Sequence, residues 1–470
     1  MCRRNTAVGV AAIIVAGLLP VSACRATCDQ IAAQRHSLYR GAQGPTGAPA
    51  IAGESSEQPH ARLIIPHARA NMLLAEIVAS ARQELVVALP PLTVSLPGLA
   101  DHVVTLPPLN VAAPGLRLAP ARPHHVGLAI DLEFGLANSP VLGDQSGRES
   151  GTGQAVASAT VHVEAKPAVE QSDSGLALRI GFAADSVRSI EPTLQPRGAR
   201  ALTDLVYRTL PASVRSRIPR SVVTVVLDRA IASLVSRSYG LVRQTVLRRL
   251  GAITELRIGL PDLPIAQVQV HSLARPAALV IDLRTELPVR HGLAAGYSID
   301  PMMLGAVRLR LAGDVVTESA NWAIEQGLAP TRYNRVMKPE RDGDYVPLFA
   351  WRQGSARPLV VHVFRLSAPC GHIQLATRAD LAVHGGKLAV TITDRNIEHV
   401  AGSTAVKLGI WLDTLWTRRF VRTEKRAAHT CISIGRQTLE TQITDAQLLR
   451  SELVFALDFA ITGQIGRAHV

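Results

Sequence analysis

Short runs of alternating apolar and polar residues recur along most of this chain, and one long segment between residues 200 and 250 interrupts them. Alternation with a period of two residues is typical of a β-strand that buries one face. Polar turns such as residues 143–147 separate the runs. The pattern predicts strands over residues 126–136, 155–163, 176–182, 253–260, 265–271, 278–287, 306–311, 359–366, 372–383, 388–393, 406–412, 431–439 and 453–461.

The interrupting segment carries apolar residues at helical spacing. Pro211 and Pro219 break its first part and Gly251 is a natural stop, so we expect a helix over residues 221–250, about 45 Å long. Shorter helices are predicted over residues 68–87 and 315–326. We therefore expect an α+β fold that is β-rich, with curved antiparallel sheets packed around one long amphipathic helix. The apolar stripe of that helix contains Val222, Val226, Leu234, Val242 and Val246.

The first 24 residues combine a basic start, an uncharged apolar run and a small-small-Cys ending. Arg3 and Arg4 precede the apolar residues 7–19, which are too few to span a membrane, and Ser22 and Ala23 precede Cys24. This order resembles the signal and lipobox of bacterial lipoproteins. The resemblance implies that residues 1–23 are a signal peptide, that the chain is cleaved before Cys24, and that Cys24 carries acyl chains of the palmitate kind. A plain secretory signal cut nearby and a chance cysteine remain the alternatives.

The residue after Cys24 bears on where such a lipoprotein would reside. It is Arg25, whereas Asp at this position favours retention in the inner membrane in well-studied Gram-negative lipoproteins. The resemblance thus implies the outer membrane, with the protein body facing the periplasm. Several acyl chains together would make the anchor effectively permanent.

Composition divides the remaining chain into three parts. Residues 24–60 are rich in Gly, Pro, Ser and Ala, which predicts a flexible, lipid-anchored tether. Residues 61–290 form the first expected β-rich domain, which contains the long helix. Residues 291–470 form the second.

Three cysteines remain once Cys2 leaves with the signal and Cys24 is acylated. An oxidising compartment favours a disulfide between Cys370 and Cys431, with Cys28 left over. The alternative is that Cys370 and Cys431 are two separate buried thiols. The chain has no CxxC pair and no Cys/His cluster, so we expect neither a structural metal nor a redox site.

The formal net charge of +13 points to an anionic partner. Residues 200–250 hold ten arginines and two aspartates, so most of the excess lies on one segment. An exported basic protein meets anionic lipid, lipopolysaccharide or polyanionic wall material, and no helix-turn-helix or zinc-finger pattern supports nucleic-acid binding.

Catalytic motifs are absent from the sequence, which contains no GxSxG, HExxH, phosphate loop or dinucleotide fingerprint. Asp394, Glu398 and His399 are close in sequence and would be an acid-base cluster only if a cleft brought them together. We therefore expect a protein that is not an enzyme and that uses no cofactor.

Element order and aliphatic composition resemble the tubular lipid-binding superfamily, which includes bactericidal permeability-increasing protein. The resemblance implies that an acyl chain or sterol-like ligand lies between the stripe on residues 221–250 and the facing strands. The expected function is an envelope lipoprotein that binds or transfers a lipid or other hydrophobic ligand. The alternative is a non-enzymatic envelope scaffold or assembly protein with solid cores. A continuous apolar cavity beside residues 221–250 would separate the two.

Overall fold

The computed structural model describes much of the chain outside the long predicted helix. The described residues are 21–39, 50–51, 58–80, 85–87, 92–94, 102–104, 109–136, 155–172, 175–181, 187–194, 200, 203–204, 207–208, 210–216, 219, 221, 225, 256–260, 263–275, 277–294, 306–334, 339–384, 387–403, 406–408, 423–427, 429–434 and 437–464.

Eight strands of the described residues form a central sheet, which is antiparallel except for the parallel pair β1 and β13. In spatial order they are β1 (Ala50–Ile51), β13 (Ile265–Ala274), β14 (Ala277–Thr285), β2 (Ala61–Pro66), β15 (Val307–Ala312), β23 (Glu452–Gln464), β22 (Gln437–Leu448) and β21 (His429–Ile434).

Two five-stranded antiparallel sheets flank it, and we name each after its middle strand. The β7 sheet has the order β11 (Val187–Leu194), β8 (Ala155–Ala165), β7 (Val126–Leu136), β6 (Leu109–Ala119) and β3 (Leu85–Val87). The β18 sheet has the order β16 (Tyr345–Trp351), β17 (Leu359–Arg365), β18 (Gly371–His384), β19 (Lys387–Gly402) and β20 (Thr423–Ala427).

Smaller elements complete the described structure. One small sheet has the order β12 (Leu256–Gly259), β10 (Gly175–Ile180) and β9 (Ala168–Ser172), and another pairs β4 (Leu92–Val94) with β5 (His102–Val104). The helices are α2 (Val21–Tyr39), α3 (His67–Ser80), α5 (Ala212–Arg215) and α7 (Gly313–Glu325).

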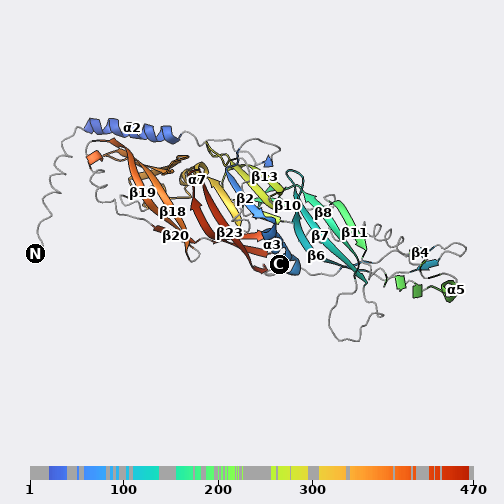
Figure 1. Cartoon of the computed structure of the whole chain (residues 1–470). Helices are drawn as coiled ribbons and strands as arrows, with labels where there is room; N and C mark the ends of the chain where they lie inside the picture. Colours follow the sequence, from blue (N-terminus) through green and yellow to red (C-terminus); the bar gives the residue numbers. More distant parts are fainter. Residues whose placement is uncertain are drawn as a thin grey trace, which may run out of the picture.

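The molecule is elongated, with the β18 sheet at one end, the central sheet in the middle and the β7 sheet beyond it (Figure 1). Helix α2 runs over β18 and β19, and α3 packs against β6, β2 and β14. Helix α7 follows β15 directly and contacts β16. There the Asn321 amide donates to the Phe349 carbonyl and accepts from the Phe349 N–H, both at 2.8 Å, so α7 covers part of the edge of the β18 sheet.

The β-rich, antiparallel part of the predicted fold is confirmed. The prediction of helix 315–326 matches α7, and that of helix 68–87 matches α3 in part. The long helix over residues 221–250 falls almost wholly outside the described residues; only Ser221 and Val225 are described, and both are helical and exposed. The domain boundary at residue 290 stays a prediction, although strands from both sides of it share the central sheet.

The predicted strand over residues 406–412 is wrong where the structure describes it, because residues 406–408 are helical. Strand β19 ends at Gly402, whose φ of 134° few other residues adopt. Ser403 then caps a helical turn: its side-chain oxygen accepts from the Val406 N–H and its carbonyl from the Lys407 N–H. Val406 packs so closely on Gly371 that an added Cβ there would meet its Cγ1 at 2.6 Å.

A buried ion pair crosses the middle of the central sheet. Arg62 on β2 lies opposite Asp282 on β14, and the two form a bidentate contact of 2.7 Å and 3.0 Å. Both residues are buried. Burying two charges costs desolvation energy, which their mutual attraction offsets. Removing one partner therefore leaves the other as an uncompensated buried charge. On the same face, Arg310 of β15 forms a second bidentate pair with Glu452 of β23, at 2.9 Å.

This pair gives a stability prediction. Asp282→Ala should lower the free energy of unfolding by about 3–5 kcal/mol, because it leaves the Arg62 guanidinium buried without its carboxylate. The double variant Arg62→Met/Asp282→Leu should recover most of that loss, since no buried charge remains. Denaturant unfolding of both variants checks this, and a double variant no more stable than Asp282→Ala would contradict it.

Candidate functional site

The β7 sheet presents one continuous apolar face. Side chains alternate along each strand, and the register aligns Leu128 with Val163, Ile130 with Val161 and Leu132 with Ala159. Neighbouring β6 adds its own leucines opposite Leu128 and Ile130. We call this surface the apolar face; it comprises Leu116, Leu118, Val126, Leu128, Ile130, Leu132, Phe134, Ala159, Val161, Val163 and Ala165, all of them buried.

The apolar face is mainly aliphatic and well buried. Its side chains are aliphatic apart from Phe134, and those in the middle of β7 and β8 are no more than 3% exposed. Full burial of a Val, Leu or Ile side chain contributes roughly 1.5–3 kcal/mol. The low exposure of these side chains shows that other parts of the protein already cover this face.

The opposite face of the same sheet is polar and ion-paired. Arg117 of β6 pairs with Asp131 of β7, which also accepts a 3.0 Å hydrogen bond from the Thr160 hydroxyl. Glu164 binds Arg122 at 2.8 Å and Arg188 at 2.7 Å. An open pocket of about 370 Å³ lies on this face, lined by Gly115, Asp131, Leu132, Glu133, Ser158, Ala159 and Thr160. The sheet therefore separates an aliphatic surface from a hydrophilic one.

The residues predicted to line a ligand site lie outside the described residues: Val222, Val226, Leu234, Val242 and Val246. Their helix was inferred from spacing alone, and the apolar face was found only through strand register. The sequence does carry the signal for that face, because the alternating apolar positions of residues 126–134 and 159–165 are the ones that it buries.

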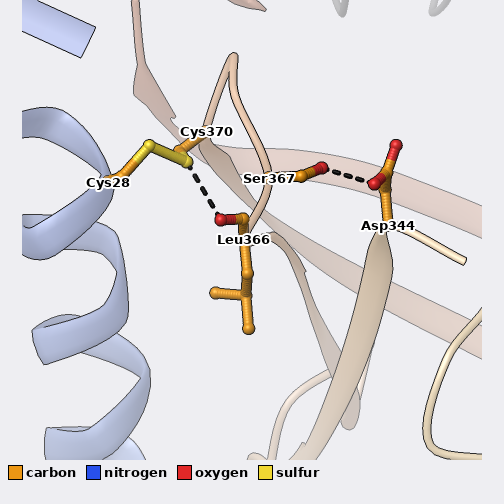
Figure 2. Close-up of a disulfide and its surroundings, with 5 residues drawn as sticks. All are labelled: Cys28, Asp344, Leu366, Ser367 and Cys370. Atoms are coloured by element: carbon orange, nitrogen blue, oxygen red, sulfur yellow. Dashed lines mark hydrogen bonds between the residues drawn. A yellow bond between two sulfur atoms is a disulfide. The ribbon is translucent and has the colours of Figure 1, made fainter. Parts of the chain in front are cut away.

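The predicted disulfide between Cys370 and Cys431 is wrong, because Cys370 is bonded to Cys28 (Figure 2). Cys28 lies on α2 and Cys370 lies directly before β18, 342 residues later. The prediction fails because the Gly-, Pro-, Ser- and Ala-rich composition of residues 24–60 indicates a flexible tether, in which Cys28 would have no fixed position. Cys431 lies on β21 of the central sheet.

The tether prediction is also wrong over residues 24–39, which belong to α2. Cys28 and Ile31 are spaced to face the same side of the helix. Ile31 is 3% exposed and packs with Leu348, Phe364 and Cys370 of the β18 sheet. This packing explains why a segment with little helical amphipathicity is held in place. Cys24 lies in the same helix, one turn before Cys28.

Beneath α2, the β18 sheet buries a column of stacked rings. The Phe364 ring stacks on His372 at 4.4 Å, and His372 stacks on His362 at 5.3 Å. The two imidazoles share a 3.1 Å hydrogen bond between His362 Nδ1 and His372 Nε2, so one ring donates and the other accepts. His399 of β19 lies at the edge of the column, 5.7 Å from His372. Phe364 also contacts the apolar cluster that receives Ile31.

Burial lowers the pKa values of His362 and His372. Desolvation, followed by the neighbouring His362 and His399, lowers the pKa of His372 to about 4. The pKa of His362 is lowered as well, first by desolvation and then by Arg352, while Glu398 opposes this effect. A lowered pKa means that the unfolded chain binds protons more readily than the folded one, so acid favours unfolding.

We expect the free energy of unfolding to be highest above pH 6.5 and to fall as the pH drops toward about 4, as the His372 pKa dictates. His372→Leu should make this dependence shallower over the same range. The control is His384→Leu, at an exposed position near the end of β18. Denaturant unfolding at a series of pH values tests this, and an unchanged slope in His372→Leu would contradict it.

The acidic residues of the 394–399 segment are engaged in ion pairs. Glu398 binds Arg352 through both carboxylate oxygens, at 2.5 Å and 2.7 Å, and accepts a 2.7 Å hydrogen bond from Gln374. These contacts lower the pKa of Glu398, the Arg352 hydrogen bond most strongly. Asp394 binds Arg357 at 2.6 Å. The segment thus pairs with arginines from the β16–β17 connection, and His399 instead joins the ring column.

None of the helices in the described part of the chain is long and apolar enough to cross a membrane. Within the same residues, no group of three or more His, Cys, Asp or Glu side chains is arranged to hold a metal ion.

Comparison with known proteins gives distant structural likenesses. No protein-family model and no curated protein matches the chain. Among solved structures, P47 of Clostridium botulinum E1 has a TM-score of 0.40 at 8% identity, covering 85% of this chain and 98% of its own. P47 from Clostridium botulinum A2 has a TM-score of 0.36 at 7% identity, with coverages of 85% and 97%. A lipopolysaccharide binding protein has a TM-score of 0.21 at 10% identity, with coverages of 86% and 100%.

Proposed function

We propose that this chain is a membrane-anchored envelope lipoprotein, not an enzyme, that binds or transfers a lipid or another hydrophobic ligand. The observation that carries the proposal is the apolar face of the β7 sheet. It is continuous across neighbouring strands, aliphatic and buried, and it is backed by a polar, ion-paired face. An extended acyl chain is complementary to such a surface, because it offers apolar area without polar groups that need partners.

The amphipathic stripe predicted over residues 221–250 is the partner that we assign to this face. A lipid tail would lie between the two apolar surfaces, while the arginines of residues 200–250 would attract an anionic headgroup or an anionic membrane surface. In this proposal the lipid tail fills space between these two surfaces that protein side chains would fill in an ordinary hydrophobic core.

The disulfide supports export of the chain. Disulfides persist in oxidising compartments such as the periplasm and are rare where thiols are kept reduced. The Cys28–Cys370 bridge therefore fits the signal-like first 23 residues. We propose that the protein is anchored through acylated Cys24 at the outer membrane and that its body faces the periplasm.

The anchor is tested by removing the acylated sulfur. Cys24→Ser should abolish the acyl mass on the mature chain and release the protein into the soluble fraction, because the acyl chains on Cys24 are the proposed membrane anchor. Cys431→Ser is the matched control and should remain acylated and membrane-bound. Intact-protein mass spectrometry and membrane flotation give the two readouts. Membrane association that persists unchanged in Cys24→Ser would refute the anchor.

Ligand binding is tested on the apolar face itself. The purified protein should yield an acyl lipid on extraction with organic solvent, as measured by mass spectrometry. Ala159→Phe adds bulk at a buried position of the apolar face and should reduce the extracted lipid per protein several-fold. Ser158→Phe adds a similar bulk at the preceding residue, whose side chain lies on the opposite face of the sheet, and should leave the amount of extracted lipid unchanged. Equal lipid from both variants would contradict a ligand on this face.

A scaffold or assembly protein is the second candidate, and the pockets of the described residues favour it. One is open and polar, and another, lined by Pro59, Gln267, Gln269, Asp282 and Arg284, holds only about 10 Å³. If the wild-type protein yields no lipid on extraction, the apolar face belongs to a solid core and this second function stands.

A further inference from the structure

The bridge between α2 and the β18 sheet bears on how the protein sits on a membrane. Cys24 precedes Cys28 by four residues of one helix, which is about 6 Å along the helix axis. Cys28 is covalently bound to Cys370, and Ile31 is buried against Leu348 and Phe364. An anchor on Cys24 is therefore held beside a defined part of the folded body.

The alternative geometry would be very different. Were α2 free, the residues between Cys24 and Ala50, where β1 begins, would allow a separation of up to about 85 Å. A body on so long a connection would sample many distances and orientations above the bilayer. The disulfide removes that freedom where α2 meets the start of β18 (Figure 2).

We propose that the Cys28–Cys370 disulfide seats one end of the β18 sheet on the bilayer surface. The end in question is the turn between β17 and β18, where Ser367, Ala368 and Pro369 are exposed next to buried Cys370. This inference rests on the lipid anchor of the proposed function. The partner is a phospholipid surface, and the contact is set by the bridge rather than by a long tether.

The same sheet provides an internal measure of orientation. Strand β18 runs from Gly371 to His384, about 43 Å at the usual rise per residue, and β18 and β19 run away from α2 (Figure 1). The β17–β18 turn should therefore touch lipid, while exposed His384 at the other end of β18 should stand clear of it.

The experiment uses the full-length, lipidated protein in vesicles of phosphatidylethanolamine and phosphatidylglycerol. A photoreactive benzoylphenylalanine replaces Ala368 in one sample and His384 in another, and phospholipid adducts are measured by mass spectrometry after illumination. We expect adducts at position 368 and only background at position 384. Reduction of the disulfide, or Cys28→Ser, should lower the adduct at position 368 by about tenfold, because the freed helix permits a long tether. Cys431→Ser should change nothing.

The outcomes separate this inference from the proposed function. The protein could sediment with the vesicles and yet give equal adducts at both positions, or an adduct that reduction does not change. Either result overturns the orientation set by the disulfide and leaves the lipid anchor intact. Protein that does not sediment with the vesicles overturns the anchor, and the seating falls with it. Reduction of the sample labelled at position 368, with both cysteines present, gives a result that does not depend on how well Cys28→Ser folds.

Discussion

Each of the large described sheets has an aliphatic face to bury. The described architecture depends on which helices and neighbouring sheets cover these faces. Aromatic residues make up only 4% of the chain, so the buried surfaces are built mainly from Ala, Val, Leu and Ile. Aliphatic side chains form long, even faces, and each helix with a described contact covers part of one: α2 the β18 sheet, α3 strand β6 and part of the central sheet, and α7 the junction of β15 and β16.

The proposed anchor and the proposed ligand surface lie at opposite ends of an elongated molecule. Helix α2 and the β18 sheet form one end, and the β7 sheet lies beyond the central sheet (Figure 1). With the α2 end at the bilayer, the apolar face would stand away from the membrane to which the protein is bound. That arrangement suits a protein that carries a hydrophobic molecule from one surface to another. The β7 sheet would hold the molecule, while α2 would anchor the protein to the membrane.

Strand patterning is the part of the fold that could be predicted from the sequence. The strand predicted over residues 126–136 matches β7 to the residue, because its alternation is regular and polar residues such as His125 and Asn138 flank it. Helix 315–326 was found to within two residues at each end. Residues 406–408 were misassigned because a serine cap after Gly402 decides that turn, and an apolar run cannot show it.

The candidate sites depended on tertiary contacts that local patterns do not contain. The composition around Cys28 is typical of a linker and does not indicate a partner. Only the docking of Ile31 onto the β18 sheet brings Cys28 to Cys370. The Arg62–Asp282 pair joins residues 220 positions apart, and the His362–His372 contact depends on the register of β17 with β18. The spacing of such residues in the sequence does not indicate that they lie together in the fold.

The central claim is that one chain holds a lipid covalently at α2 and a second hydrophobic molecule non-covalently on the apolar face. Native mass spectrometry of the full-length protein, released gently from membranes, measures both on one molecule. We predict two added masses: acyl chains that survive unfolding and map to Cys24, and a further lipid that leaves when the protein unfolds. A native mass equal to that of the unfolded chain would contradict the ligand, and an unfolded chain without acyl mass would contradict the anchor.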